Sequence, residues 1–183
     1  MGRRWYDADT LDRLNAASPE RLRPMLAFMG WVGLRRSEAW NVTPADVSLT
    51  LGAATVRVIR KGGHHETLPI PNAVANAVRP YVWGREPTVR LYPRSYSTLG
   101  TDVTALGRKV GVPLASHDLR RSFGRILYYE YHVDINDIRA LYGHRTIGMT
   151  EYYIGVSEDR LRTSVSAFDR PRMPHPPPVT VGV

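Results

Sequence analysis

The sequence predicts a mainly helical α+β domain that contains a small three-stranded antiparallel sheet. Apolar residues recur at helical spacing in residues 9–40 and in most of the chain after residue 71. Between these regions they alternate with polar residues, which is typical of short strands. The 183 residues, of which 43% are hydrophobic, suffice for one domain with a sizeable core.

Three helices are expected before residue 41. The first begins at a capping side chain, either Asp9 or Thr10, and its apolar positions are Leu11, Leu14 and Ala17. Ser18-Pro19-Glu20 combines a cap with a proline and begins the second helix, whose apolar side holds Leu22, Leu26 and Met29. Two glycines then precede a third helix, predicted at residues 36–40.

A small sheet is predicted where the spacing changes. Three short runs mark its strands: Val47, Leu49 and Leu51, then Val56 and Val58, then Glu66-Thr67-Leu68. The glycine-containing segment 61–65 is the predicted turn between the last two strands. His64 and His65 in this turn do not predict a metal site, because adjacent histidines point apart and lack carboxylate partners. Pro71 suits the first position of a helix that reaches Val82.

The rest of the chain is predicted to be helical up to residue 168. The expected helices are Tyr96–Val110, His117–Tyr131, Asp134–Leu141, Thr146–Tyr153 and Ser157–Phe168. From Arg170 onwards prolines prevent a helix, so residues 170–183 are predicted to form a disordered tail. One domain over residues 1–169 is therefore expected before this tail.

The charge balance favours a polyanionic partner. The formal net charge is +8, and Lys61 and Lys109 are the only lysines among 25 basic residues. Arginine presents a planar fork that fits pairs of phosphate oxygens, so nucleic acid is the leading candidate. A basic surface without a specific partner also fits the charge alone. The chain has no cysteine, which excludes disulfides and thiol nucleophiles, and no apolar run of membrane-spanning length, so no membrane partner is predicted.

Four polar side chains, His117, Arg120, His144 and Tyr153, suit chemistry on a phosphodiester. His117 and Arg120 are three residues apart, which places them on one face of a helix. There a guanidinium can bind two phosphate oxygens while an imidazole donates to the phosphate or moves a proton. For this pair alone, a capping histidine beside a surface arginine is the simpler alternative. Gly143 is a predicted helix C-cap, which leaves His144 where the chain turns back.

These residues, together with two upstream motifs, resemble the catalytic domain of the tyrosine recombinases, the family of phage integrases and Xer proteins. The motifs that carry the resemblance are Gly33-Leu34-Arg35-Arg36-Ser37-Glu38, Lys61-Gly62-Gly63, His117-Asp118-Leu119-Arg120-Arg121-Ser122-Phe123, Gly143-His144 and Tyr153. They cover nearly all of the predicted domain, residues 8–168. The chain departs from the family pattern at Tyr142, where leucine usually precedes the Gly-His pair.

The resemblance implies a phosphate-binding site. Arg35 and Arg120 are the implied clamps of the scissile phosphate, with the imidazoles of His117 and His144 beside them. Glu38 lies three residues after Arg35, so it is expected to pair with Arg35 and hold its guanidinium in place. An ordinary surface ion pair is the alternative for Glu38.

The resemblance also implies a nucleophile and a general acid. Tyr153 is the implied nucleophile, since it follows His144 at the family's spacing of nine residues, and its neighbour Tyr152 is the rival. A free phenol has a pKa of about 10, so nearby cations must favour the phenolate. Lys61 is the implied general acid that protonates the leaving 5′-oxygen. A solvated lysine that contacts the DNA backbone is the alternative for Lys61.

The implied reaction cleaves and rejoins double-stranded DNA through a 3′-phosphotyrosyl intermediate, with no metal ion, ATP or other cofactor. Helix 157–168 is expected to support self-association on DNA, and the family's usual N-terminal DNA-binding domain is absent from this sequence. The implied location is the cytoplasm and its nucleoid, or the host cytoplasm for a virus- or plasmid-encoded protein. Two alternatives remain: DNA relaxation of the type IB topoisomerase kind, and a non-catalytic DNA-binding module.

Overall fold

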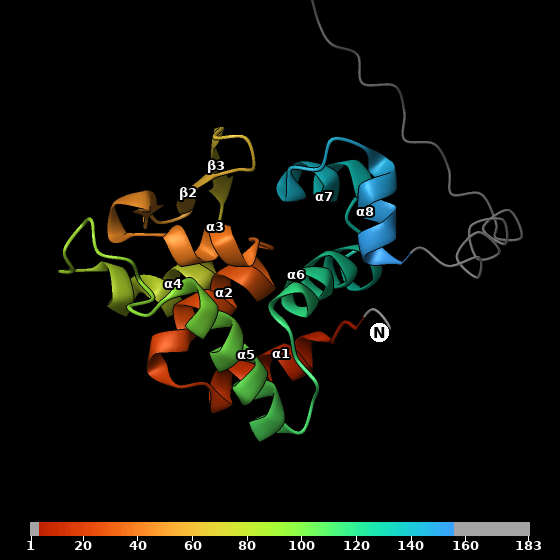
Figure 1. The fold of residues 1–183 in the computed structure, drawn as a ribbon. Helices are drawn as coiled ribbons and strands as arrows, with labels where there is room; N and C mark the ends of the chain where they lie inside the picture. The colour runs from red at the N-terminus through yellow and green to blue at the C-terminus, as the bar shows by residue number, and fades with distance from the viewer. Residues whose placement is uncertain (1–3, 156–183) are drawn as a thin grey trace, which may run out of the picture.

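The computed structural model describes residues 4–155 and has the predicted architecture, mainly helical with one small antiparallel sheet (Figure 1). Its α-helices are α1 (Ala8–Ala17), α2 (Arg23–Trp31), α3 (Arg36–Asn41), α4 (Asn72–Val82), α5 (Tyr96–Val110), α6 (Ser116–Arg125), α7 (Ile135–Tyr142) and α8 (Ile147–Ile154). Shorter elements are the 3-10 turns η1 (Glu20–Leu22) and η2 (Pro44–Asp46), the π-helix η3 (Ile126–Glu130), and the strands β1 (Val47–Ser48), β2 (Thr55–Ile59) and β3 (His65–Pro69). The helix expected at residues 157–168 and the expected tail lie outside the described residues.

The starts of the first two helices differ from the prediction. Asp7 caps α1, and the prediction of Asp9 or Thr10 is wrong, because the Asp7 carboxylate accepts a 2.9 Å hydrogen bond from the Thr10 N–H, as a cap requires. Ser18-Pro19-Glu20 leads into η1 instead of starting α2. Helix α2 begins after it, with Pro24 in the first turn, where the missing N–H breaks no helical bond.

The sheet is antiparallel in the order β1-β2-β3, with Val47 opposite Val56. Strand β1 has only two residues, so the predicted alternation through Leu49 and Leu51 does not continue it. Leu51 is 90% exposed, because the chain turns away from the sheet after β1. His65, predicted as a turn residue, begins β3.

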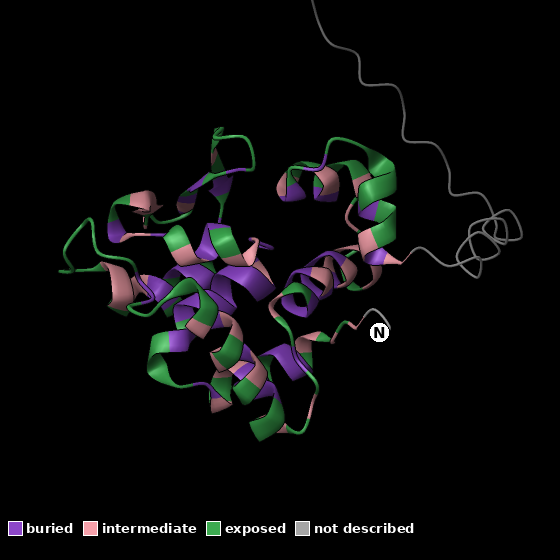
Figure 2. Cartoon of the chain, viewed as in Figure 1, coloured by how far each residue is buried: buried purple, intermediate pink, exposed green. Residues whose placement is uncertain are grey.

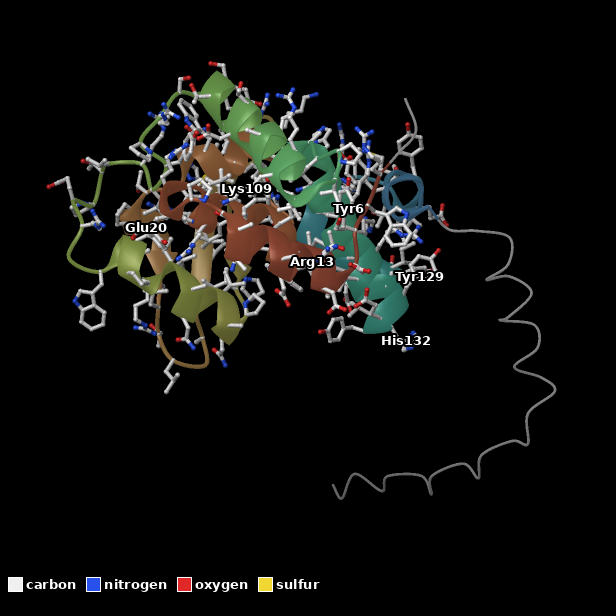
Figure 3. All side chains as sticks on the ribbon, turned by 90° about the horizontal axis from the view of Figure 1, so that it is seen from below. Tyr6, Arg13, Glu20, Lys109, Tyr129 and His132 are labelled. Atoms are coloured by element: carbon white, nitrogen blue, oxygen red, sulfur yellow. The ribbon has the colours of Figure 1, made fainter. Side chains whose placement is uncertain are left out.

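The main hydrophobic core forms around α2. Residues 25–30 of this helix are all buried, and α4 and α6 pack against it (Figure 2). The inner face of the sheet adds the apolar side chains of Val56, Val58 and Leu68. Lys109, which Figure 3 labels on α5, donates a 2.8 Å hydrogen bond to the Ala17 carbonyl at the end of α1. No helix within residues 4–155 is long and apolar enough to cross a membrane.

A second, smaller core joins α6 to the α7–α8 pair. It contains Phe123, Ile138, Tyr142 and Ile154, all of them buried. Gly33, in the loop before α3, approaches α6 so closely that an added Cβ atom would lie 2.3 Å from the Phe123 ring. Its φ of +74° is also a left-handed conformation that favours glycine. This contact brings the α2–α3 loop against α6, which in turn packs against α8.

The helix predicted over His117–Tyr131 is an α-helix only in its first part. Helix α6 ends at Arg125 and η3 follows, with the Tyr131 N–H donating to the Ile126 carbonyl five residues earlier at 3.1 Å. Helices α7 and α8 lie within one residue of their predicted bounds, and Asp134 caps α7.

Candidate active site

The segments that carry the predicted site residues meet between α3, α6 and the α7–α8 pair (Figure 1). The side chains come from the start of α3 (Arg35, Glu38), from α6 (His117, Arg120), from the residue after the α7 C-cap (His144) and from α8 (Tyr153). Contacts between these side chains link all of these segments. The first residue of the set, Arg35, and the last, Tyr153, are more than 100 residues apart in the sequence. The predicted residues other than Lys61 therefore form one cluster.

Glu38 is a buried carboxylate among three arginines. Its Oε1 accepts from Arg35 Nη1 at 2.8 Å and its Oε2 from the Arg35 main-chain N–H at 2.8 Å, so the expected pair is present. Oε2 also accepts from Arg60 Nη1 at 3.1 Å and lies 3.6 Å from Arg120 Nη1. Burial raises the pKa of Glu38, but these hydrogen bonds and charges outweigh it and hold the pKa below its ordinary value. A second carboxylate, Glu66, accepts from Arg60 at 2.6 Å. Two carboxylates therefore face three guanidiniums, and the excess positive charge suits the binding of an anion.

Arg120 is completely buried. Its Nη1 donates to the Gly33 carbonyl, and its Nη2 donates to the Tyr142 carbonyl at 2.7 Å. Burial, followed by the charge of Arg35, lowers the pKa of Arg120 to about 10, so the cation persists at neutral pH. The sequence spacing predicts a guanidinium and His117 side by side on one helix face, but only His117 is exposed there. The guanidinium is enclosed because carbonyls from two distant segments bind it.

The ring of Tyr153 faces both histidines. The ring centroids of Tyr153 and His117 are 6.3 Å apart, those of Tyr153 and His144 are 5.2 Å apart, and both contacts are edge-on. The guanidinium carbon of Arg120 lies 6.0 Å from the Tyr153 centroid. Tyr152, the rival, is 56% exposed. These contacts favour Tyr153 as the phenol that can react within the cluster.

His144 is buried, and both of its ring nitrogens have a partner. Nδ1 lies 3.0 Å from the Thr150 hydroxyl and Nε2 lies 3.5 Å from Arg120 Nη2. Because a guanidinium only donates, Nε2 must be the acceptor, and Nδ1 carries the proton. Burial, followed by neighbouring arginine cations, lowers the pKa of His144 to about 4. The pKa of His117 is lowered by the same two causes, so both imidazoles are neutral at pH 7.

The pKa of His144 predicts a pH-dependent stability. The folded state holds this pKa near 4, below the ordinary 6.5, because of burial and the cations of Arg120, Arg35 and Arg60, which Glu38 offsets in part. Between these pH values the unfolded chain binds more protons, so stability rises with pH and is lost as the pH falls, by up to about 3 kcal/mol.

Urea unfolding at several pH values measures this loss. His144→Asn should flatten the decrease in unfolding free energy between pH 6.5 and pH 4.5, while a matched His64→Asn on the exposed turn should leave it unchanged. A His144→Asn variant with the wild-type slope would contradict the assignment.

Lys61 is not part of the cluster. It lies exposed on the β2–β3 turn beside Gly62 and Gly63, and within residues 4–155 its ammonium makes no hydrogen bond or ion pair. Its neighbour Arg60 does reach the cluster, because Arg60 Nη2 donates to the Leu141 carbonyl at 2.8 Å. The turn that carries Lys61 is therefore attached to the site through Arg60.

Sequence reasoning missed two residues of the cluster, Arg60 and Tyr142. A signal for Arg60 was present: it continues the alternation of Val56 and Val58, whose side chains are buried, so strand geometry points it inward. The sequence marks Tyr142 only as a departure from the family pattern. No local pattern shows that its ring lies against Arg120, with the guanidinium carbon 4.4 Å from the ring centroid.

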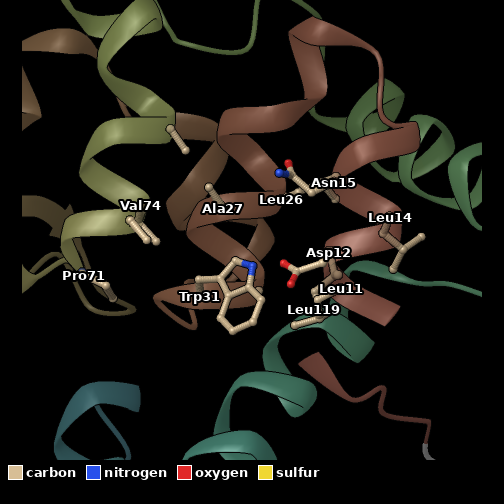
Figure 4. A pocket seen from close by; sticks show the side chains of 13 residues that line it. Leu11, Asp12, Leu14, Asn15, Leu26, Ala27, Trp31, Pro71, Val74 and Leu119 are labelled. Carbon is tan, nitrogen blue, oxygen red and sulfur yellow. The ribbon is translucent and has the colours of Figure 1, made fainter. Parts of the chain in front are cut away.

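A groove lies beside the cluster, and a smaller pocket lies away from it. A groove of about 830 Å³ is lined by Arg35 and His117 and by polar and basic side chains of α3 and α5, among them Arg36, Thr104 and Arg108. A smaller, mostly apolar pocket of about 320 Å³ lies between α1, α2 and α4 and includes none of the predicted site residues (Figure 4). Across the described part of the chain, no group of three or more histidines and carboxylates could hold a metal ion.

Comparison with known proteins gives a consistent result. The family model for the phage integrase family matches residues 4–160. Tyrosine recombinase XerA of Pyrococcus furiosus is 30% identical over 155 residues, covering 79% of this chain and 54% of the relative. Tyrosine recombinase XerA of Thermococcus kodakarensis is 33% identical over 161 residues, covering 81% and 56%. The crystal structure of a XerA recombinase has a TM-score of 0.72 at 21% identity, covering 92% of this chain and 66% of that one. The chain spans about half the length of the curated relatives that it matches.

Proposed function

Because this chain belongs to the phage integrase family, we propose that it is the catalytic part of a tyrosine-type site-specific recombinase. It cleaves and rejoins double-stranded DNA through a 3′-phosphotyrosyl intermediate and uses neither a metal ion nor ATP. One observation carries the proposal: the Tyr153 ring lies near His117 and Arg120 of α6 and near His144, which follows α7. A phenol, two neutral imidazoles and a buried cation together suit attack on a phosphodiester.

Tyr153 is the nucleophile in this proposal. A bond forms between its phenolic oxygen and the scissile phosphorus while the bond from phosphorus to the 5′-oxygen breaks. The phenol proton passes to the neutral imidazole of His117, whose lowered pKa leaves it free to accept. Lys61 gives a proton to the 5′-oxygen, which leaves as a hydroxyl. A second 5′-hydroxyl reverses these steps and rejoins the strands.

Arginines stabilise the charge that develops on the phosphate. Arg35, whose side chain is 27% exposed, reaches the phosphate from the surface, and Glu38 fixes its guanidinium. Arg120 contacts the phosphate from the buried side of the site. Its buried Nε–H has no acceptor within residues 4–155, and a phosphate oxygen can supply one. Losing one such donor typically lowers the rate by roughly 10²–10³-fold.

Double-stranded DNA is the proposed partner. The groove beside the site is lined by Arg35, Arg36 and Arg108, and the net charge of the whole chain is +8. The same proposal takes residues 1–169 as the catalytic domain, with helix 157–168 docking on a second copy when both are on DNA. Such an enzyme works in the cytoplasm beside the nucleoid, or in a host cytoplasm.

A suicide substrate tests the function. A pool of nicked duplexes with a randomised central segment is incubated with the protein in chelator, without ATP, so that the cleaved 5′-hydroxyl fragment diffuses away. We expect a covalent protein–DNA band on a denaturing gel, and the trapped duplexes should share a sequence. Trapping without any sequence preference would favour a topoisomerase, and binding without any covalent band would favour a DNA-binding module.

A further inference from the structure

We propose that Tyr142 is a positioning residue for strand cleavage. Its buried ring and its main-chain carbonyl hold the Arg120 guanidinium, and the same ring orients Tyr153. This inference rests on the proposed function. It concerns the position at which the chain departs from the pattern that it otherwise resembles. Tyr142 itself touches no reacting atom in the proposed mechanism.

Tyr142 contacts both ends of Arg120. The Arg120 guanidinium carbon lies 4.4 Å from the centre of the Tyr142 ring, a cation–π contact inside the core. Arg120 Nη2 donates to the Tyr142 carbonyl at 2.7 Å, and the Tyr142 hydroxyl donates to the main-chain carbonyl of Arg120. Two of these contacts restrict the guanidinium directly, and the third fixes the main chain that carries it.

The same ring lies against two other proposed catalytic side chains. Its centroid is 4.8 Å from that of His144 and 5.6 Å from that of Tyr153. Phe123 packs edge-on against it at 5.8 Å and closes the other side. Because Tyr142 is fully buried, a smaller side chain would leave a cavity next to both Arg120 and Tyr153.

Helix α6 has space for the Tyr142 hydroxyl only because residue 124 is glycine. A Cβ atom added to Gly124 would lie 2.1 Å from Tyr142 Oη and 2.8 Å from Cζ. Burial raises the pKa of Tyr142, so the phenol stays protonated and keeps donating to the Arg120 carbonyl. Gly124 and Tyr142 therefore form a matched pair between α6 and α7.

The alternative role for Tyr142 is to fill the core, and Tyr92 provides the comparison. Tyr92 is also buried, and its hydroxyl donates to Asp102 at 2.8 Å, but it contacts none of the proposed catalytic side chains. Loss of a structural tyrosine should lower stability at either position. Only a positioning tyrosine should also change the rate of the covalent step.

Single-turnover cleavage separates the two roles. The full chain is tested as Tyr142→Leu, Tyr142→Phe and Tyr92→Leu on a trapped suicide duplex at saturating concentration. We expect Tyr142→Leu to slow adduct formation by about 10–100-fold with DNA affinity nearly unchanged, because the reacting groups are misplaced. Tyr142→Phe, which keeps the ring and the carbonyl, should stay within a few-fold of wild type, and Tyr92→Leu should cleave at the wild-type rate.

A duplex with sulfur in place of the scissile 5′-oxygen identifies the affected step. Sulfur leaves without a proton, so this duplex should restore the rate of Lys61→Ala but not that of Tyr142→Leu, whose defect concerns the phosphate clamp and the nucleophile. A wild-type cleavage rate in Tyr142→Leu, or an equal loss of cleavage rate in Tyr92→Leu, would overturn this inference and leave the proposed function standing. Absence of any adduct with the wild-type chain would overturn the proposed function and this inference with it.

Gly124→Ala gives a readout that does not depend on activity. It should lower the melting temperature strongly in the wild-type background and much less in Tyr142→Leu, because the atoms that the new methyl group meets are gone. Equal losses in both backgrounds would show that the Tyr142 ring does not lie beside Gly124, and the contacts on which the inference rests would then be wrong, even if Tyr142→Leu alone were poorly folded.

Discussion

Replacing Tyr153 with phenylalanine is expected to abolish the covalent DNA adduct. Phenylalanine keeps the ring that lies edge-on to His117 and His144 but lacks the oxygen that would bond to phosphorus. Removal of the nucleophile from other covalent enzymes costs roughly 10⁴-fold or more in rate, which places the variant below detection in a gel assay. The measurement is the suicide-duplex assay in chelator, with DNA affinity determined in parallel to show that binding survives.

Tyr152→Phe is the matched control, since it removes the same atom from the adjacent residue. Tyr152 is 56% exposed, while the Tyr153 ring faces the cluster, so Tyr152→Phe should form the adduct at close to the wild-type rate. If the band were lost in Tyr152→Phe and kept in Tyr153→Phe, the nucleophile would be Tyr152. Helix α8 would then have to turn by about 100° for the reaction, since adjacent helical residues point that far apart.

Local sequence signals predicted much of the fold. Helix α5 has its predicted bounds, Tyr96–Val110, because Ser95 caps its first turn and Gly111 adopts the left-handed conformation after its last. The π-helix at Ile126–Glu130 was not predictable in the same way. Its residues show an ordinary helical pattern, and nothing local specifies hydrogen bonds that span five residues instead of four.

The site shows the same division between local and distant contacts. The Arg35–Glu38 pair follows from three-residue spacing, and it was predicted and is present. The enclosure of Arg120 depends on the Gly33 carbonyl, 87 residues earlier, and on the Tyr142 carbonyl, 22 residues later. Such partners become neighbours only when α6 packs against both segments, so the sequence identifies the guanidinium but not its surroundings.

Glu38→Gln is expected to destabilise the fold by about 3–5 kcal/mol, because it removes the carboxylate beside the buried Arg120 and leaves Arg60 with Glu66 alone. An amide keeps the shape but turns an N–H group toward guanidiniums that can only donate. Arg35 loses a charged acceptor at 2.8 Å, Arg60 loses one at 3.1 Å, and Arg120 keeps only carbonyl and imidazole partners. Urea unfolding at pH 7 measures the loss. Because the pKa of Glu38 is lowered in the fold, its stabilisation is present above pH 4.5 and lost as the pH falls further, so the variant should also lack this acid-side decrease.

Asp46→Asn is a matched control for this prediction. Asp46 accepts from the main-chain N–H of Thr43 three residues earlier at 3.1 Å, as Glu38 does from Arg35, but its arginine partner Arg57 has a side chain that is 55% exposed. Solvent screens that pair, so Asp46→Asn should cost no more than about 1 kcal/mol. Equal losses at the two positions would mean that the capping hydrogen bond, common to both, accounts for the effect. A clearly larger loss of stability in Glu38→Gln would instead assign the effect to the buried guanidiniums. Glu38→Gln should then also cleave DNA slowly at temperatures where it is fully folded, because Arg35 is no longer held in place.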